Sequence, residues 1–253
     1  MNYKLLNSLK KKLKEKKPTI GSWIQSPSLT NAEILAKNGY DWIAIDMEHG
    51  QINYSEHENL VRVIEASNCV PLTRVSKSDS DQVKHALDSG SYGVILPMIK
   101  NFQKLSSLIE SILLPPVGNR SVGFCRANNY GDEVDNYLKK FKRPIIVPMI
   151  ENVEVFKDLD KISNILHVDA LFIGPYDLSS SLKKPGKFND KSFKALERQF
   201  LKMCSKNKMT AGIHVVSNDI KEVKNKIKTG YKFVAFCTDT KFLSYSSKIK
   251  NFF

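Results

Sequence analysis

Acidic, basic and imidazole side chains recur where short apolar segments of this chain end. Carboxylates and arginine are almost never fully buried without partners, so several of them at equivalent ends of a sheet should face one shared polar pocket. The alternative is an ion-pair network with a purely structural role. The residues concerned are Asp46, Glu48, His49, Arg74, Glu151, Asp177 and, within a later segment, His214.

Two carboxylates follow neighbouring segments and have no lysine or cysteine close by in the sequence. Glu151 and Asp177 are oxygen donors of the kind that hard divalent cations prefer, with water and substrate oxygens completing the shell. A carboxyl pair that shares a proton, as in general acid/base dyads, is the alternative. The sequence favours a site for Mg²⁺ or Mn²⁺ held by these two residues.

Arg74 and His49 could supply the remaining chemistry at the same rim. The guanidinium of Arg74 is a planar, permanently charged fork that suits a substrate carboxylate or a developing enolate oxygen. His49 is the one evident proton carrier near neutral pH there. A histidine base needs an orienting partner, and Asp88 is a candidate that spacing alone does not establish.

The elements that must position these residues are eight short apolar segments with helix-like stretches between them. Nearly continuous apolar runs are typical of strands buried on both faces of a parallel sheet. The predicted strands are Ile20–Gln25, Trp42–Met47, Val70–Val75, Gly93–Met98, Pro144–Ile150, Ala170–Pro175, Thr210–Val215 and Phe233–Asp239.

Eight such units in one chain of 253 residues predict a (β/α)8 TIM-type barrel over residues 1–253. No G-x-G-x-x-G follows the first strand, so a dinucleotide-binding fold is not expected. Capping boxes are predicted at Thr30-x-x-Glu33 and Ser55-x-x-Glu58, and left-handed helix ends at Gly39, Gly90 and Gly230. The long connections 115–133 and 181–190 are expected to serve the active site, which in barrels lies at the carboxyl ends of the strands.

The charge is uneven along the chain. There are 39 Lys and Arg residues against 26 Asp and Glu, a formal charge of +13, and residues 1–17 hold seven lysines and one glutamate. Leu6, Leu9 and Leu13 recur there at helical spacing, which predicts a Lys-rich amphipathic helix across a barrel end or on an anionic surface. No arginine-rich stripe with interleaved aromatics appears, so nucleic-acid binding is not expected.

Several classes of protein are excluded by composition. A hydrophobic content of 42% is too high for a disordered chain, and no apolar run is long enough to span a bilayer. The N-terminal region lacks the features of a secretory signal, so we expect a cytoplasmic protein. The four cysteines, at positions 69, 125, 204 and 237, have no metal-finger or C-x-x-C spacing and should be reduced.

From about Thr19 to Phe242 the chain resembles the HpcH/HpaI aldolase family. This family comprises metal-dependent class II pyruvate aldolases, of the 2-keto-3-deoxy acid aldolase type, in the phosphoenolpyruvate/pyruvate barrel superfamily. Together the matching motifs are highly specific, although each alone is weak. They are GSWIQSPS (21–28), GYDWIAIDMEHG (39–50), Arg74 with ALDSG (86–90), GVILPMI (93–99), GNRSVGFCRANNYG (118–131), Glu151 and FIGPYDLSSSL (172–182).

The resemblance implies a role for each matching residue. His49 is the expected base with Asp88 as its supporting aspartate, and Asp46 is expected to hold the surroundings of the histidine. Arg74 is the expected substrate arginine, and Glu151 and Asp177 are the expected metal ligands. Glu48 belongs to the matching motif without an assigned role. The residues implied or expected to contact substrate are Trp23, Gly174, Pro175, Tyr176 and His214.

Three residues depart from the family pattern. Met149 stands where many members have glutamine, Tyr176 where many have a small residue, and His214 where an aliphatic side chain is common. If His214 points into the barrel mouth, it should donate a hydrogen bond to the aldehyde half of the substrate. If it faces the helices, backbone groups should satisfy it.

The implied reaction is reversible cleavage of a 4-hydroxy-2-oxo acid, of the 2-keto-3-deoxy sugar acid type, to pyruvate and an aldehyde. It requires a divalent metal ion and small-molecule substrates, and a homo-oligomer is expected. A condensing enzyme that uses a similar metal enolate and an oxaloacetate-type decarboxylase remain as alternatives. A non-catalytic protein that binds an anionic surface through its lysines is the alternative from another class.

Overall fold

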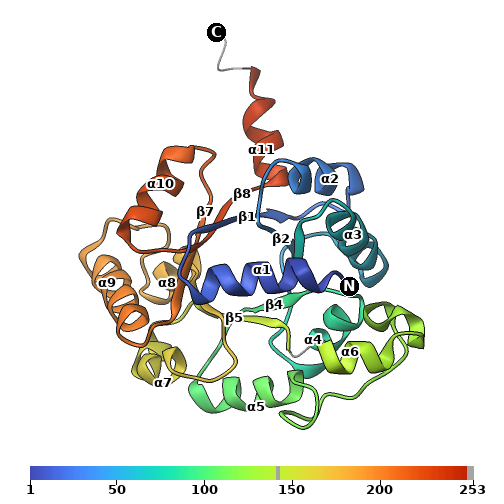
Figure 1. Ribbon diagram of the computed structural model, residues 1–253. Helices are drawn as coiled ribbons and strands as arrows, with labels where there is room; N and C mark the ends of the chain where they lie inside the picture. Colours follow the sequence, from blue (N-terminus) through green and yellow to red (C-terminus); the bar gives the residue numbers. More distant parts are fainter. Residues whose placement is uncertain (141–142, 250–253) are drawn as a thin grey trace.

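In the computed structural model, which describes residues 1–140 and 143–249, eight parallel strands close into a barrel (Figure 1). Each strand pairs with the next in the sequence, and β8 closes the ring on β1 through the pair Thr19 and Phe233. The predicted (β/α)8 barrel is therefore confirmed. The strands are β1 (Thr19–Ile24), β2 (Trp42–Asp46), β3 (Val70–Arg74), β4 (Gly93–Leu96), β5 (Ile145–Ile150), β6 (Ala170–Ile173), β7 (Thr210–Val215) and β8 (Phe233–Thr238).

Helices surround this barrel and cover the outer faces of the strands (Figure 1). Two short 3-10 segments, η1 (Arg126–Gly131) and η2 (Val153–Lys157), lie in the connections before and after β5. None of the helices in the described ranges has the length and hydrophobicity needed to cross a membrane. The outer helices are α2 (Leu29–Lys37), α3 (Tyr54–Ala66), α4 (Ser80–Asp88), α5 (Phe102–Ile112), α6 (Val134–Lys140), α7 (Leu159–Ser163), α8 (Pro175–Ser181), α9 (Lys191–Lys206), α10 (Ile220–Thr229) and α11 (Asp239–Ser246).

Large side chains fill the interior of the barrel, because alternate residues of each strand point inward. Trp42 and Phe233 stack with their ring centroids 4.1 Å apart. Gly21 faces this stack, and a Cβ atom there would lie 2.1 Å from the ring of Trp42. Glycine at position 21 therefore leaves space for the Trp42 ring inside the barrel.

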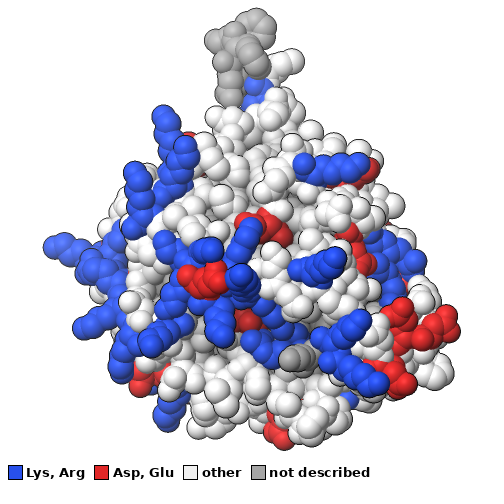
Figure 2. Space-filling model, in the orientation of Figure 1, with Lys and Arg blue, Asp and Glu red and all other residues white. Residues whose placement is uncertain are grey.

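The Lys-rich N-terminal region forms α1 (Tyr3–Lys14), which crosses the amino end of the barrel (Figure 1). Its Leu6, Leu9 and Leu13 side chains are buried against the barrel. The Thr210 hydroxyl donates a 2.8 Å hydrogen bond to the Leu13 carbonyl. The first of the two expected placements, across a barrel end, is confirmed. Lysine and arginine side chains gather on this face of the molecule (Figure 2), which lies opposite the carboxyl ends of the strands.

Two of the local sequence signals were misplaced by two residues. The expected capping boxes at Thr30 and Ser55 are wrong, since Ser28 caps α2 and Asn53 caps α3. The Asn53 side chain accepts from the backbone of Glu56, and the Glu56 carboxylate accepts from the backbone of Asn53 at 2.8 Å, so the real box begins earlier. The three glycines expected to end helices do have positive φ, at 84°, 93° and 121°.

Candidate active site

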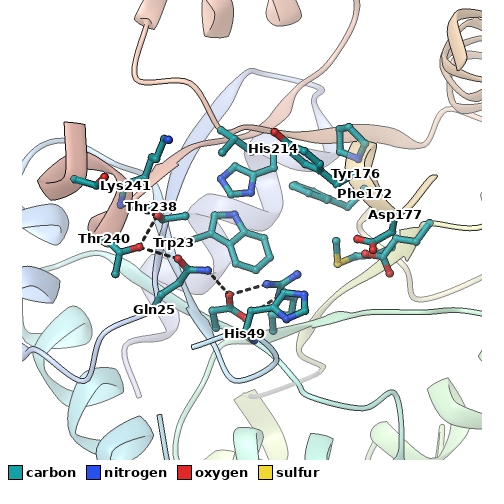
Figure 3. Close-up of a pocket in the computed structure, with 18 residues that line it drawn as sticks. Trp23, Gln25, His49, Phe172, Tyr176, Asp177, His214, Thr238, Thr240 and Lys241 are labelled. Carbon is teal, nitrogen blue, oxygen red and sulfur yellow. Dashed lines mark hydrogen bonds and ion pairs between the residues drawn. The ribbon is translucent and has the colours of Figure 1, made fainter. Parts of the chain in front are cut away.

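A pocket of about 570 Å³ opens at the carboxyl ends of the strands (Figure 3). Its walls come from strands or strand ends on opposite sides of the barrel, which is why residues far apart in the sequence meet there. Of the site residues predicted from the sequence, all but Asp88 and Glu48 line it. They are Trp23, Asp46, His49, Arg74, Glu151, Gly174, Pro175, Tyr176, Asp177 and His214.

A buried ion pair fixes one wall of the pocket. Asp46 ends β2 and accepts two hydrogen bonds from Arg74 at the end of β3, from Nε at 2.9 Å and from Nη2 at 2.6 Å. Burial alone would raise the pKa of Asp46, but the charge and hydrogen bonds of Arg74 outweigh burial and the pKa is lowered. The Arg74 guanidinium also lies 4.4 Å above the ring of Trp23. Arg74 is thus held in one orientation before any substrate binds.

The loop after β2 positions the expected base. The Asp46 carboxylate accepts hydrogen bonds from the backbone N–H groups of Glu48 and His49, at 3.1 and 3.2 Å. Glu48 lies 3.0 Å from Nη1 of Arg74, and its other near neighbour is Nε2 of His49 at 3.9 Å. The His49 side chain is 62% exposed and faces the pocket, so a substrate proton can reach it.

Carboxylates are in excess on the other wall. Glu151, after β5, is buried and accepts a 2.6 Å hydrogen bond from the backbone N–H of Met98. Burial raises the pKa of Glu151 to about 7, and the negative charges of Asp177 and Glu48 add to the rise, against the opposing effects of the Met98 N–H and Arg74. Burial and these charges therefore favour the protonated form of Glu151 more than in an ordinary carboxyl group.

Glycine 174 allows the Glu151 carboxylate to occupy this place. A Cβ atom on Gly174 would lie 2.7 Å from Cγ and 2.9 Å from Oε1 of Glu151. Pro175 then begins α8, and Asp177 falls in the first turn of that short helix. The FIGPYD motif thus places Asp177 near enough to Glu151 for its negative charge to raise the pKa of Glu151.

This donor set fits a hard divalent cation. No group of three or more His, Cys, Asp or Glu side chains within residues 1–140 and 143–249 has the arrangement of a metal site. Glu151 and Asp177 would supply two oxygen ligands. The pKa of Glu151 is raised chiefly by burial and further by the negative charges of Asp177 and Glu48, and a cation bound there would offset both effects. A site with two carboxylates leaves positions for water and substrate, as Mg²⁺ commonly has.

His214 lies on the floor of the pocket in a defined tautomer. Its ring stacks on Trp23 with centroids 5.2 Å apart, and Nε2 lies 3.0 Å from the carbonyl oxygen of Cys237. Since a carbonyl only accepts, Nε2 carries the proton; burial lowers the pKa to about 4, so the ring is neutral. The expected donation from His214 to the substrate is wrong for this arrangement, because the remaining Nδ1 can only accept.

Asp88 does not join the site within one chain. The charged and polar groups that act on its pKa are Arg120, Lys84, Cys125 and His85, none of them in the pocket, and burial is the main reason that this pKa is raised. Asp88 ends α4, and a helix that follows a barrel strand returns to the amino end of the barrel. Within one chain the structure therefore does not bring Asp88 to His49, and the carboxylate beside His49 is that of Glu48.

The two long connections expected to serve the site do not line it either. Arg126 in the first connection makes an ion pair with Glu65 and donates a 3.1 Å hydrogen bond to the Ser89 carbonyl. These contacts hold the connection beside the ends of α3 and α4. No residue of the second connection, 181–190, lines the pocket.

Sequence reasoning missed a group of pocket residues at and after the ends of β1 and β8. Gln25 donates to Asp46 at 3.0 Å and accepts from Thr240 at 2.8 Å. Thr238, Lys241 and Ser244 also line the pocket, on and before α11. Gln25 and Thr238 stand at strand ends like the predicted site residues, but neither is a carboxylate, a histidine or an arginine.

Known proteins resemble this chain over most of its length. Residues 19–245 match the HpcH/HpaI aldolase/citrate lyase family. The chain is 30% identical over 230 residues to a 2-dehydro-3,6-dideoxy-6-sulfogluconate aldolase from Pseudomonas putida, covering 90% of this chain and 89% of the other. It is also 30% identical over 245 residues to a 4-hydroxy-2-oxo-heptane-1,7-dioate aldolase from Escherichia coli, covering 96% and 92%.

Solved structures agree with these relatives. A HpcH/HpaI aldolase/citrate lyase family protein from Burkholderia cenocepacia superimposes with a TM-score of 0.89 at 27% identity, covering 95% of this chain and 96% of the other. The resemblance found in the sequence motifs is therefore confirmed. The chain belongs to the HpcH/HpaI aldolase/citrate lyase family and is an enzyme of the lyase class.

Proposed function

We propose that this enzyme reversibly cleaves a 4-hydroxy-2-oxo acid to pyruvate and an aldehyde, with Mg²⁺ or Mn²⁺ held by Glu151 and Asp177. The observation that carries the proposal is the excess of carboxylate on one wall of the pocket, facing Arg74 on the other. When bound, the divalent ion would supply positive charge that stabilises an enolate. Members of the family generally depend on such metals, and the names of the relatives include oxo-acid aldolases.

Arg74 would bind the oxo-acid end of the substrate. Its Nε and Nη2 are occupied by Asp46, and Nη1 lies toward Glu48. The guanidinium charge remains available to an oxyanion as it develops, and the bonds to Asp46 prevent the side chain from reorienting. The backbone at Gly174, Pro175 and Tyr176 is the proposed seat of the pyruvate carboxylate.

His49 would take the proton of the 4-hydroxyl group. The C3–C4 bond then breaks, the aldehyde carbonyl forms at C4, and the electron pair remains on the pyruvate fragment as an enolate. A proton delivered to C3 of that enolate gives pyruvate. Glu48, with its carboxylate 3.9 Å from Nε2, is the acidic side chain beside this imidazole.

The test is incubation of the purified protein with pyruvate, Mg²⁺ and a panel of aldehydes, with products identified by mass spectrometry. We expect aldol adducts that disappear when EDTA is added. Release of carbon dioxide from oxaloacetate without any aldol product would favour the decarboxylase alternative. Condensation only with an activated acyl donor would favour the condensing-enzyme alternative.

A homo-oligomer and cytoplasmic residence are also proposed. Helix α11 extends away from the barrel (Figure 1), and its Leu243 and Tyr245 are 67% and 47% exposed. Phe124 in the connection before β5 is 82% exposed. Apolar side chains so placed favour association with another copy of the chain. Light scattering coupled to size-exclusion chromatography would measure the mass in solution.

A further inference from the structure

The pocket extends well beyond the wall that holds the carboxylates. In Figure 3, Asp177 lies at one side and Lys241, Thr238 and Thr240 lie at the opposite side, with Trp23 and His214 between them. At about 570 Å³ the pocket is much larger than a three-carbon acid. The side that includes Lys241 is therefore available to the aldehyde half of the substrate.

Lys241 is a cation without an ionic partner in this pocket. The other basic side chain of the pocket apart from histidine, Arg74, is paired with Asp46 at 2.6 Å and with Glu48 at 3.0 Å. Across the described residues, no carboxylate forms an ion pair with Lys241. The nearest acidic residue in the sequence, Asp239, is buried and accepts hydrogen bonds from other groups, including the backbone N–H of Gln25 at 2.8 Å.

The hydroxyl groups of the neighbouring Thr238 and Thr240 already donate hydrogen bonds within the protein. Thr240 donates to Oε1 of Gln25 at 2.8 Å, and Gln25 donates through Nε2 to Asp46 at 3.0 Å, so the carboxylate fixes the direction of the chain. The Thr238 and Thr240 hydroxyl oxygens lie 3.0 Å apart. Because Thr240 already donates its hydroxyl proton to Gln25, Thr238 is the donor in this contact. The ammonium group of Lys241 remains as the strong donor at this side of the pocket.

We propose that Lys241 binds a carboxylate carried by the aldehyde half of the substrate, at the end away from the reacting carbonyl. The inference rests on the proposed function, which places the pyruvate half at Glu151, Asp177 and Arg74. An oxo acid with a second acidic group would then span the pocket, with each end opposite a cation. The enzyme would prefer acidic aldehydes over neutral ones of the same length.

The experiment compares succinic semialdehyde with butanal, which differ in a carboxylate replacing a methyl group. Each is condensed with pyruvate and Mg²⁺ by the wild-type protein, by Lys241→Gln, and by Lys241→Arg. Lys77→Gln serves as the control, since Lys77 is an exposed lysine after β3 at the same end of the barrel and does not line the pocket. The quantity measured is the ratio of kcat/KM for the acidic aldehyde to that for the neutral one.

The wild-type ratio should exceed one, and Lys241→Gln should lower it about tenfold, the effect of losing one charge-assisted hydrogen bond. Lys241→Arg should restore most of the ratio, and Lys77→Gln should leave it unchanged. The KM of the wild-type protein for succinic semialdehyde should also rise with added NaCl more than the KM for butanal.

An equal effect of Lys241→Gln on both aldehydes, or a wild-type preference for butanal, would overturn the inference. Failure of the proposed function would look different. In that case the wild-type protein would form no adduct with either aldehyde and would not exchange the methyl protons of pyruvate with solvent in the presence of Mg²⁺.

Discussion

Replacing Gly174 by alanine should weaken metal binding by displacing a carboxylate. The added Cβ atom would lie 2.7 Å from Cγ and 2.9 Å from Oε1 of Glu151, where ordinary van der Waals contacts are 3.4–4 Å. The first distance is short by at least 3.4 − 2.7 = 0.7 Å. Glu151 is buried and bonded to the backbone N–H of Met98, so it has little room to retreat without losing that bond.

The size of the effect follows from the cost of overpacking. Extra methyl groups in a packed site cost about 1–3 kcal/mol. If the Glu151 side chain moves to relieve the contact, the loss appears in metal affinity as an increase in Kd of about 5- to 150-fold. If the side chain stays, the same free energy appears instead as a lower Tm, by about 2–4 °C for each kcal/mol in a chain of this size.

Both quantities are measurable in one experiment. Isothermal titration with Mn²⁺ gives Kd, and differential scanning calorimetry of the metal-free protein gives Tm. Gly123→Ala is the matched control, because a Cβ atom at Gly123 would have nothing within 4 Å. A Gly174→Ala protein that binds Mn²⁺ and unfolds like the wild type would refute the placement of Glu151 in the metal site.

Three further perturbations test the other parts of the site. His49→Ala should slow aldol cleavage by about 10²–10⁴ while Mn²⁺ still binds, as stopped-flow and titration measurements would show; cleavage at the wild-type rate would point to another base. Arg74→Ala should lower the free energy of unfolding in urea by about 3–5 kcal/mol, because the buried charge of Asp46 loses its partner; no change would mean that water replaces the guanidinium. His57, buried and bonded to Thr73 at 2.7 Å, has a pKa lowered by burial from 6.5 to about 4. The folded state binds the proton less readily than the unfolded state, so about 3 kcal/mol of the free energy of unfolding should be lost as the pH falls from 6.5 to 4. The stability of His57→Gln should depend less on pH over this range. If its pH dependence is unchanged, groups other than His57 cause the loss.

The strands and the charged wall of the pocket could be predicted because each depends on a local pattern. A run such as Trp42–Asp46 is apolar enough to require burial on both faces, and the acidic residue that ends it has to face a polar space. The barrel then places all strand ends together. Position along the strands was therefore enough to group Asp46, Arg74 and Glu151.

Other features depend on distances that a sequence does not contain. The predicted pairing of His49 with Asp88 fails within one chain because the helix carries Asp88 away from the pocket. The tautomer of His214 is set by the carbonyl of Cys237, on the neighbouring strand. The capping of α3 was misjudged because Asn53 and Ser55 both offer suitable side chains, and only the geometry selects Asn53.

Exchange of the methyl protons of pyruvate with deuterium tests the central claim most directly, since it needs the enolate but no aldehyde. Proton NMR would follow the methyl signal in heavy water with the wild-type protein and Mg²⁺, with EDTA, and with Glu151→Gln. We expect exchange by the wild-type protein with Mg²⁺, no exchange when EDTA is added, and little exchange by Glu151→Gln with Mg²⁺. Exchange that persists in EDTA, together with a pyruvate adduct trapped by borohydride, would show Schiff-base chemistry and contradict the assignment of Glu151 and Asp177 as metal ligands.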